Sequence, residues 1–496
     1  MSFHELVENQ RNYFLTGKSA SLAHRRTQLL KLRKALTDDQ DLLLEAVYKD
    51  LRRQKDLSYI CEFIPALMEI DYMLDNLKEW TSPTDVQKTF VTMLDKPHIV
   101  RQPKGVVLVI GPWNYPLNTL LVPLIAVMAA GNTAIVKPSE IASHTAHALD
   151  LVLSKTFDKQ YLAVVQGGVD VTTELLNERY DHIMFTGSTP VGRAILRAAE
   201  KHLTPCTLEL GGKCPTLIEP DADIEITARR LVWGKLLNCG QTCLAPDYVI
   251  VHSSVKNKLV DAITRTLHNF YGKHFQSSPD YSRIINTSHF ERLESLLERT
   301  KAPRLFDGGE LDRDDLFIPP FLLDATVQDP IMENEIFGPI LPIITTNSFA
   351  ESLSIVRARE RPLALYLFTR DESKVQRVLS ETSSGSVTIN DVILQLTVDT
   401  LPFGGIGHSG MGRYRGKYGF DEFTHEKAVL KRGFFADGIA SARYPPLTEK
   451  KVAQLHYLTA TRRSVPGWMK RSFRAFPCLL IGFLVGLIVN RFHPVV

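Results

Sequence analysis

Short apolar runs alternate with helix-like segments along most of the chain, and this alternation restricts the fold more than any other feature. Residues 106–110, Val-Val-Leu-Val-Ile, form the first clear run. Further runs lie at residues 133–136, 162–167, 182–185 and 207–210. Runs that are apolar at successive positions are typical of strands buried on both faces of a parallel sheet. Because helix-like segments such as residues 120–130 separate them, the sequence predicts a Rossmann-like α/β sheet.

A second α/β half is predicted between residues 211 and 415. Its strands are expected at residues 249–251, 340–345, 363–368 and 386–390. Residues 3–80 are expected to form amphipathic helices, because leucines recur there among charged side chains. Residues 86–99 favour an extended segment, and residues 423–430 form a short apolar stretch. A chain of 496 residues is long enough for two or three domains.

A cysteine-containing turn after the helix-like segment 226–237 is the clearest candidate for chemistry. Cys239 and Cys243 lie there among small and polar residues, and Pro246 follows, so we expect a thiol on a tight turn. A buried, unreactive side chain is the commoner role of a cysteine. A zinc site would need a second Cys/His pair, which the sequence lacks, so no metal is predicted.

A carboxylate lies between two leucines in the segment Leu208-Glu209-Leu210. An apolar environment raises the pKa of a carboxyl group, which suits a general base that works near neutral pH. Together with the Cys243 thiol, Glu209 indicates nucleophilic catalysis through a covalent intermediate.

The composition excludes some classes of function. A net charge of +3 is too small to indicate a nucleic-acid partner. The six cysteines show no disulfide-framework spacing, which favours a reducing compartment. The N-terminus has no charged segment followed by an apolar one, so no signal peptide is expected.

Six motifs, in order along the chain, resemble those of the aldehyde dehydrogenases. They are Gly-Pro-Trp-Asn-Tyr-Pro at 111–116, Phe-Thr-Gly-Ser at 185–188, Leu-Glu-Leu-Gly-Gly-Lys at 208–213, Asn-Cys-Gly-Gln-Thr-Cys at 238–243, Glu-Ile-Phe-Gly-Pro at 335–339 and Pro-Phe-Gly-Gly at 402–405. The resemblance extends from about residue 3 to residue 430 and is strongest to the class 3 branch, which includes membrane-bound fatty aldehyde dehydrogenases.

The resemblance implies a domain organisation and a homodimer. It implies a Rossmann-like NAD-binding domain, an α/β catalytic domain and a small β arm that bridges to the partner subunit. The expected boundaries are 1–80 with 101–206 for the first, 207–415 for the second and 81–100 with 416–432 for the arm.

The resemblance also implies a reaction. Cys243 would attack the aldehyde carbon, and the Asn114 side-chain amide and the Cys243 backbone N–H would hold the oxyanion. Hydride would pass to the nicotinamide, and Glu209 would activate the water that hydrolyses the thioester. Relatives that pass the acyl group to coenzyme A lack this glutamate, so Glu209 favours a carboxylic acid product. Without the motif, Asn114 could equally be a turn former.

The loop after residues 182–185 is implied to hold the cofactor. Gly187, Ser188 and Gly192 lie between a strand and a helix that is expected to begin near Pro190. Glycine allows close backbone approach, and a helix N-terminus attracts a pyrophosphate. The spacing differs from GxGxxG, so without the resemblance a structural turn would be the better interpretation.

Four further residues are implied to bind the cofactor. Lys137 and Glu140 would reach the adenine ribose, and Glu335 and Phe337 would hold the nicotinamide ribose and ring. A carboxylate at the adenine ribose favours NAD over NADP through charge repulsion, with NADP as an alternative cofactor.

Two aromatic residues are expected to concern the substrate. Tyr115 and Trp233 are candidates for an apolar substrate tunnel, with core packing as the alternative.

Residues 433–474 form a basic linker, in which residues 450–474 hold seven Lys or Arg and no acid. Residues 475–496 are predicted to anchor the chain in a membrane. The uncharged part, residues 475–489, is shorter than the ~20 residues of a spanning helix, so an interfacial or buried helix is the alternative.

The sequence thus predicts an enzyme that oxidises medium- to long-chain aliphatic aldehydes to carboxylic acids. Its catalytic part would face the cytosol, with the tail in the endoplasmic reticulum membrane. The mitochondrial outer membrane and the peroxisome are alternative locations. Two other readings are a class 3 dehydrogenase for short-chain or aromatic aldehydes and a non-catalytic membrane-attached protein, which should have lost Cys243 or Glu209.

Overall fold

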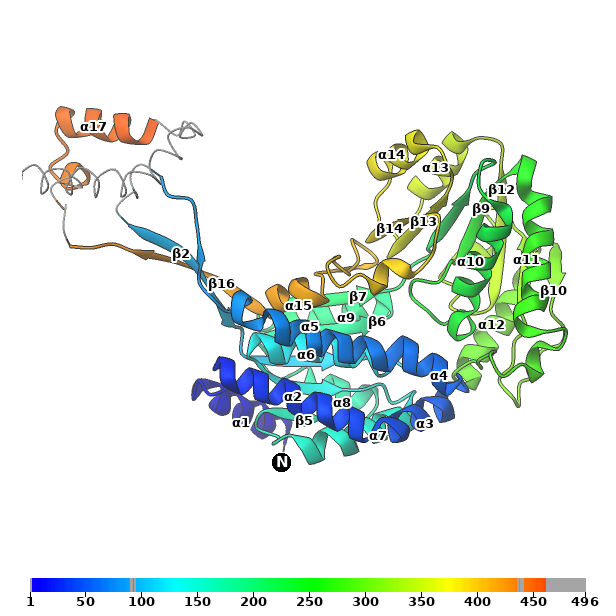
Figure 1. The fold of residues 1–496 in the computed structure, drawn as a ribbon, viewed down its shortest axis with the longest axis horizontal. Helices are drawn as coiled ribbons and strands as arrows, with labels where there is room; N and C mark the ends of the chain where they lie inside the picture. Colours follow the sequence, from blue (N-terminus) through cyan, green and yellow to red (C-terminus); the bar gives the residue numbers. More distant parts are fainter. Residues whose placement is uncertain (1, 90–91, 93–94, 435–436, 438–440, 461–496) are drawn as a thin grey trace, which may run out of the picture. The chain divides into compact units, whose positions relative to one another are not determined.

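The computed structural model describes residues 2–89, 92, 95–434, 437 and 441–460. The chain divides into two units, one of Met1–Ser82 with Arg101–Lys427 and the other of Pro83–Val100 with Ala428–Val496. The first unit holds two mostly parallel sheets and the helices that cover them (Figure 1).

The N-terminal segment is helical, as predicted. Its helices are α1 (Phe3–Leu15), α2 (Leu22–Asp38), α3 (Gln40–Leu51), α4 (Lys55–Ser58) and α5 (Ile64–Trp80), with a π-helical turn η1 (Tyr59–Phe63) before α5. The buried residues of α2 include Leu29, Leu32 and Leu36, whose spacing places them on one face of the helix. This explains why leucines recur among charged residues in this part of the sequence.

The first sheet has six strands in the order β15-β7-β6-β3-β4-β5. The strands are β3 (Val106–Ile110), β4 (Thr133–Lys137), β5 (Leu162–Val164), β6 (His182–Gly187), β7 (Cys206–Leu210) and β15 (Gly410–Met411). All neighbours pair in parallel except β15, which runs antiparallel to β7. The expected runs therefore form the sheet.

Both faces of this sheet are buried, which explains the continuous apolar runs. Val106, Leu108 and Ile110 of β3 belong to one apolar cluster, together with residues of α1 and of α9 (Thr189–Glu200). Val107 and Val109 belong to the other, together with residues of α2, α5 and α6 (Asn118–Ala130). The connecting segments also contain α7 (Ser143–Thr156) and α8 (Val169–Leu175).

The order of the strands locates a binding crevice. From β3 the chain moves through β4 to β5 on one side and then returns to β6 and β7 on the other. In open α/β sheets, ligands bind beyond the carboxyl ends of the strands where the order reverses. That point lies between β3 and β6, so the loops that follow these two strands border the crevice.

The second sheet has seven strands in the order β10-β11-β12-β9-β8-β13-β14. They are β8 (Pro215–Ile218), β9 (Tyr248–His252), β10 (Arg304–Asp307), β11 (Phe321–Asp324), β12 (Ile340–Thr346), β13 (Ala364–Phe368) and β14 (Ser386–Ile389). Only β10 pairs antiparallel. The four predicted strands are present, whereas the short strands β8, β10 and β11 were not predicted.

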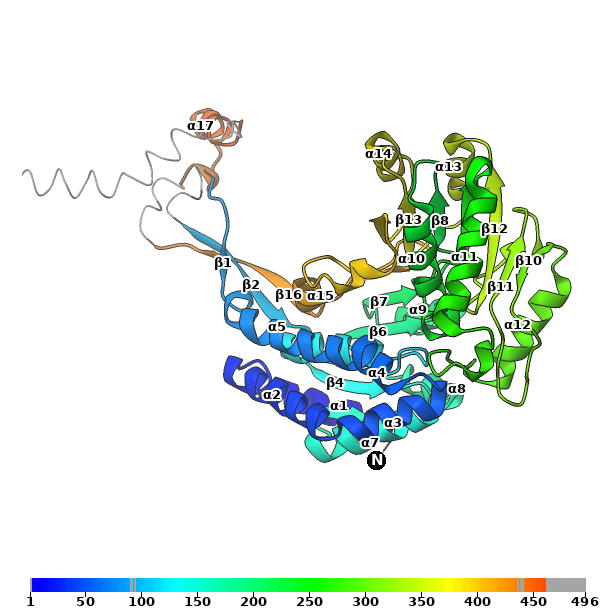
Figure 2. The ribbon, with the colours of Figure 1, turned by 45° about the vertical axis from the view of Figure 1, so that its right-hand side comes forward.

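Five helices accompany the second sheet. They are α10 (Ile224–Leu236), α11 (Lys256–Tyr271), α12 (Thr287–Arg299), α13 (Phe349–Arg357) and α14 (Glu372–Glu381). Helices α10 and α11 pack against one another, and both views show them beside the sheet (Figures 1 and 2). Helix α10 ends directly before the cysteine-containing turn.

A small three-stranded sheet has the order β1-β2-β16. Its strands are β1 (Thr84–Asp85), β2 (Lys96–Pro103) and β16 (Thr424–Lys431), and α15 (Gly416–Glu422) precedes β16. The prediction of an extended segment over residues 86–99 was too broad, because residues 86–89 lie outside any strand and β2 begins at Lys96. In the second unit, Arg432 forms an ion pair with Asp95 at 2.8 Å.

The C-terminal part of the structure ends with α17 (Glu449–Ala460). The predicted anchor, residues 475–496, and residues 461–474 of the basic linker lie outside the described residues. Within the described ranges, no helix combines the length and the apolar character needed to cross a membrane.

Candidate active site

A strained turn connects α10 to Cys243. Asn238 and Cys239 both have left-handed backbones, with φ of 53° and 56°, and Gly240 follows with φ of 77°. Left-handed residues other than glycine are uncommon and persist only when their surroundings hold them. Here the Asn238 amide donates to the carbonyls of Asn114, at 2.9 Å, and Gln241, at 3.2 Å.

The Cys243 thiol lies on a tight turn, as predicted. The backbone N–H of Ala245 donates to the carbonyl of Thr242 at 2.9 Å and closes the turn around Cys243. The Cys214 thiol donates to the Cys243 carbonyl at 3.4 Å. Burial and then the nearby Glu209 carboxylate raise the pKa of Cys243 well above its usual value, so a base must take its proton.

Glu209 lies on β7 and is 1% exposed. In the described part of the chain, neither carboxylate oxygen has a hydrogen-bond partner of suitable geometry. Burial raises the pKa of Glu209 to about 7, and opposing effects of Cys243 and Thr186 only reduce this rise. The carboxyl group is therefore half ionised near neutral pH, as a general base requires.

Asn114 follows β3 and is tied to the cysteine-containing turn. Its side-chain amide donates to the Gln241 carbonyl at 3.0 Å. Its own carbonyl accepts from the Asn238 amide at 2.9 Å and from the Arg53 guanidinium at 3.1 Å. The amide carries two hydrogens, so one stays available for a ligand.

These side chains converge on one cavity of about 1240 Å³. The predicted residues that line it are Asn114, Gly187, Ser188, Glu209, Cys243, Glu335 and Phe337. Its lining includes Gly187 and Ser188 from the end of β6 and Asn114 from the loop after β3, the two strands that flank the order reversal. A thiol, a base with a pKa near 7 and an amide donor thus share one concave site.

Comparison with known proteins identifies the family of this chain. The model of the "Aldehyde dehydrogenase family" matches residues 2–429. The chain belongs to the aldehyde dehydrogenase family. It is an aldehyde dehydrogenase, an enzyme that oxidises aldehydes to carboxylic acids and uses NAD or NADP.

Similar proteins cover nearly the whole chain. "Aldehyde dehydrogenase family 3 member A2" of Mus musculus is 46% identical over 89% of this chain and 91% of its own length. "Aldehyde dehydrogenase, dimeric NADP-preferring" of Rattus norvegicus is 43% identical, with shares of 90% and 99%. A substrate-bound structure of Staphylococcus aureus AldH has a TM-score of 0.89 and 41% identity, covering 92% of this chain and 98% of that one. These relatives support the class 3 branch.

The loop after β6 fits a dinucleotide. Ser188 precedes α9, and its side chain forms no capping hydrogen bond, so the helix N-terminus is open to an anionic group. A Cβ at position 187 would lie 2.5 Å from the Phe185 ring, and a Cβ at position 192 would lie 2.9 Å from Leu210. Glycine at these positions therefore lets the loop and the helix approach the strands closely.

The other expected cofactor residues fall into two groups. Glu335 and Phe337 line the cavity, and Trp113, which the sequence analysis did not single out, contacts the Phe337 ring with centroids 5.4 Å apart. Lys137 and Glu140 do not line it. They form an ion pair of 2.6 Å at the end of β4.

The structure does not bring the two tunnel candidates into the cavity. Tyr115 is 7% exposed, and its hydroxyl shares a hydrogen bond of 2.9 Å with Thr242. It therefore packs behind the cysteine-containing turn. Trp233 lies on α10 and is 36% exposed.

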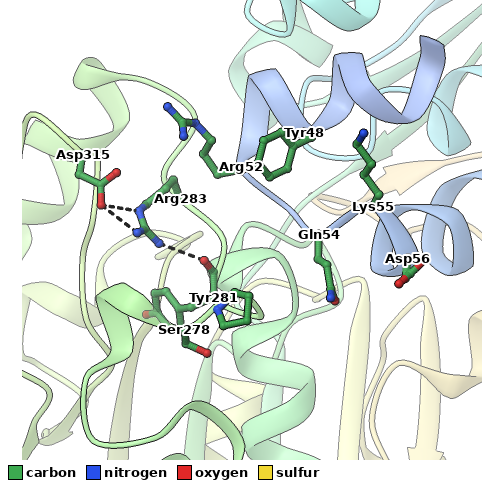
Figure 3. Close-up of a pocket in the computed structure, with 10 residues that line it drawn as sticks. Tyr48, Arg52, Gln54, Lys55, Asp56, Ser278, Tyr281, Arg283 and Asp315 are labelled. Carbon is green, nitrogen blue, oxygen red and sulfur yellow. Dashed lines mark hydrogen bonds and ion pairs between the residues drawn. The ribbon is translucent and has the colours of Figure 1, made fainter. Parts of the chain in front are cut away.

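A second, smaller cavity of about 380 Å³ lies beside the turn between α3 and α4 (Figure 3). Arg52 and Arg283 line it, and the Arg283 guanidinium binds Asp315. The backbone carbonyl of Arg283 accepts a hydrogen bond of 2.9 Å from the Gln241 side chain. None of the predicted site residues lines this cavity.

The sequence analysis did not predict several residues that line the larger cavity. Thr186, His289 and Arg292 line the larger cavity. Burial and the Arg292 charge lower the pKa of His289 to about 4, so this imidazole is neutral at physiological pH. Thr186 lies within the Phe-Thr-Gly-Ser motif, which was a usable signal, whereas no local pattern marks residues 289 and 292.

Proposed function

We propose that the enzyme oxidises medium- to long-chain aliphatic aldehydes, with Cys243 as the nucleophile, Glu209 as the base and Asn114 as an oxyanion donor. The observation that carries this proposal is the shared cavity, in which a protonated thiol lies close enough to a carboxyl of pKa about 7 for each to change the pKa of the other. Thiol and base in one site are the arrangement of nucleophilic catalysis.

In the first step, Glu209 accepts the thiol proton and the sulfur of Cys243 bonds to the aldehyde carbon. The carbonyl oxygen becomes an oxyanion, which accepts hydrogen bonds from the second amide hydrogen of Asn114 and from the Cys243 backbone N–H. When bound, the nicotinamide ring would accept the hydride that leaves the substrate carbon; the oxyanion then returns to a carbonyl, which leaves a thioester on Cys243. Glu335 and Phe337 hold and orient that end of the cofactor.

In the second step, Glu209, which has by then released the thiol proton to solvent, accepts a proton from a water molecule, whose oxygen attacks the thioester carbon. The C–S bond breaks, the carboxylic acid leaves and the sulfur of Cys243 regains a proton. Both steps require the Glu209 carboxylate as a base. A pKa near 7 suits this role, because the group must gain and lose a proton in each cycle.

Cofactor choice rests on Lys137 and Glu140. We assign both to the adenine ribose, where the Glu140 carboxylate would repel a 2′-phosphate and favour NAD. NADP is the second candidate, because the Rattus norvegicus relative is named NADP-preferring. We also assign the six-stranded sheet to the cofactor domain and the seven-stranded sheet to the catalytic domain.

The fatty-aldehyde assignment rests on relatives and on the tail. Family 3 member A2 proteins from Mus musculus and Rattus norvegicus are both 46% identical to this chain. A Staphylococcus aureus relative named 4,4′-diaponeurosporen-aldehyde dehydrogenase is 44% identical. The uncharged residues 475–489 and the basic residues before them would attach the enzyme to an anionic cytosolic leaflet, where apolar aldehydes concentrate. We place it at the endoplasmic reticulum as a homodimer whose β arms pair.

The first test is oxidation of hexadecanal by the purified full-length enzyme with NAD in mild detergent. Formation of NADH that disappears in Cys243→Ala would support both the nucleophile and the fatty-aldehyde assignment. Activity on short or aromatic aldehydes alone would retain the mechanism and reject the lipid substrate. No NADH from any aldehyde would contradict the catalytic roles proposed here.

A further inference from the structure

A fully buried arginine holds the loop that carries Asn114 from behind. Arg53 lies in the turn between α3 and α4 and is 0% exposed. Its guanidinium donates to the Asn114 carbonyl at 3.1 Å and to the Ser58 hydroxyl at 3.0 Å. It also lies 4.7 Å from the centre of the Tyr115 ring. Arg53 does not line the large cavity, so it cannot touch the substrate.

Glu62, which forms an ion pair with Arg53, binds the other end of the same loop. Glu62, also 0% exposed, lies in the π-helical turn and forms an ion pair with Arg53. Its second oxygen accepts from the backbone N–H of Leu117, at 2.7 Å, and of Asn118, at 3.3 Å. The two charges therefore fix the loop at Asn114 and again at the start of α6.

This contact reaches the cysteine-containing turn through a shared carbonyl. The Asn114 carbonyl accepts from Arg53 and from Asn238, and Asn238 also donates to the Gln241 carbonyl. That Gln241 carbonyl in turn accepts from the Asn114 side-chain amide. A shift of the Asn114 backbone would thus turn its amide away from the oxyanion position.

We propose that Arg53, held by Glu62, is a positioning residue that orients the Asn114 amide for oxyanion stabilisation. The inference rests on the proposed role of Asn114. A buried ion pair is weak evidence for stability, because desolvation offsets much of the attraction. The planar guanidinium of Arg53, however, binds three acceptors at once and so fixes the loop in one geometry. A lysine ammonium group cannot reproduce this arrangement.

The test is a double-mutant cycle with Arg53→Lys and Asn114→Ala. We expect Arg53→Lys to lower kcat by about 10- to 100-fold, the effect of a small misplacement of a catalytic group. The KM for NAD should stay unchanged. The rate at which iodoacetamide alkylates Cys243 should also stay unchanged, because alkylation forms no oxyanion. In the Asn114→Ala enzyme, Arg53→Lys should cause no further loss, because the group that it positions is absent.

The control is Arg52→Gln, which alters the neighbouring arginine of the same turn. Arg52 is exposed and lines the second, smaller cavity (Figure 3), so its replacement should leave kcat unchanged. Glu62→Gln provides a second variant: it keeps an acceptor for the Leu117 N–H but loses the ion pair, and it should lower kcat without changing alkylation.

Two outcomes would overturn the inference. If Arg53→Lys lowered kcat by the same factor with and without Asn114, or slowed alkylation in parallel, Arg53 would act on the fold in general. If Asn114→Ala kept full kcat, the proposed role of Asn114 would fail, and the inference with it. The first result leaves the proposed function intact, so the two failures are distinguishable.

Discussion

At the scale of single residues, the proposed role of Glu209 as the base predicts the pH response of the reaction. Burial raises its pKa to about 7, and the base must be ionised to accept a proton. We therefore expect kcat to rise with pH through a midpoint of about 7 and to level off above it. Initial rates at saturating aldehyde and NAD between pH 5.5 and 9 test this. A slope that persists in Glu209→Gln would assign the titration to another group.

The same carboxylate lowers the stability of the fold above neutral pH. A carboxyl whose pKa is raised on folding holds its proton more tightly in the folded state, so stability falls as pH rises from about 4.5 to about 7. The difference between those values corresponds to about 3 kcal/mol. Glu209→Gln should therefore stabilise the protein by about 3 kcal/mol at pH 8 and by little at pH 4.5, as urea unfolding can measure. A loss of stability at pH 8 would contradict this assignment of burial as the main cause.

Glu140 provides the residue-scale test of cofactor choice. Its carboxylate pairs with Lys137, and the side chain is 40% exposed, so its repulsion of a 2′-phosphate is partly screened by solvent. Glu140→Gln should raise the ratio of kcat/KM with NADP to that with NAD by about fivefold, the equivalent of about 1 kcal/mol. Lys155→Gln, which alters an exposed lysine that pairs with Asp39, serves as the control. An unchanged ratio would place Glu140 outside the cofactor site.

At the scale of elements, the turn between α10 and Cys243 leaves no space for a side chain. Gly240 has φ of 77°, and a Cβ there would lie 2.2 Å from the carbonyl of Gly338, the residue that follows Phe337. Gly17 has a similar φ of 73° with nothing within 4 Å, which makes it a matched control.

Gly17→Ala should therefore cost about 1–2 kcal/mol, the price of a left-handed backbone alone. Gly240→Ala should cost clearly more than that and should lower kcat, because the clash displaces either the cysteine-containing turn or the backbone at Gly338, next to Phe337. Thermal unfolding and initial rates of the two variants are the measurements. Equal losses would show that the Gly338 carbonyl moves aside freely.

At the scale of the whole molecule, the C-terminal segment is expected to separate substrates by chain length. Deletion of residues 447–496 removes α17, the basic residues and the uncharged run. We expect this variant to stay in the supernatant when it is sedimented with anionic vesicles, because hydrophobic and charge attraction are both lost. It should lose activity on hexadecanal far more than on short aldehydes. Equal losses on both would refute a role of this segment in delivering apolar substrates.

The sequence by itself determined most of the elements and indicated the candidate reactive groups. Apolar runs such as residues 106–110 were identifiable as strands because a sheet covered on both faces demands apolar residues at every position. Cys243 and Glu209 were candidates because of their neighbours in the sequence, a tight turn for the thiol and two leucines for the carboxylate, and the resemblance gave them their expected roles. Gly187 and Gly192 became cofactor candidates only through the resemblance, because their spacing alone favours a structural turn.

Only the tertiary structure decided which distant residues meet. Nothing local to Arg53 or Glu62 indicates that they bind the loop of Asn114, because that contact joins segments far apart in the sequence. Likewise, the sequence left a tunnel and core packing open for Tyr115, and only the structure shows that its hydroxyl packs against Thr242 in the cysteine-containing turn. Chemistry that depends on one residue type can be recognised locally, whereas orientation and burial depend on packing between segments, and packing exists only in the folded chain.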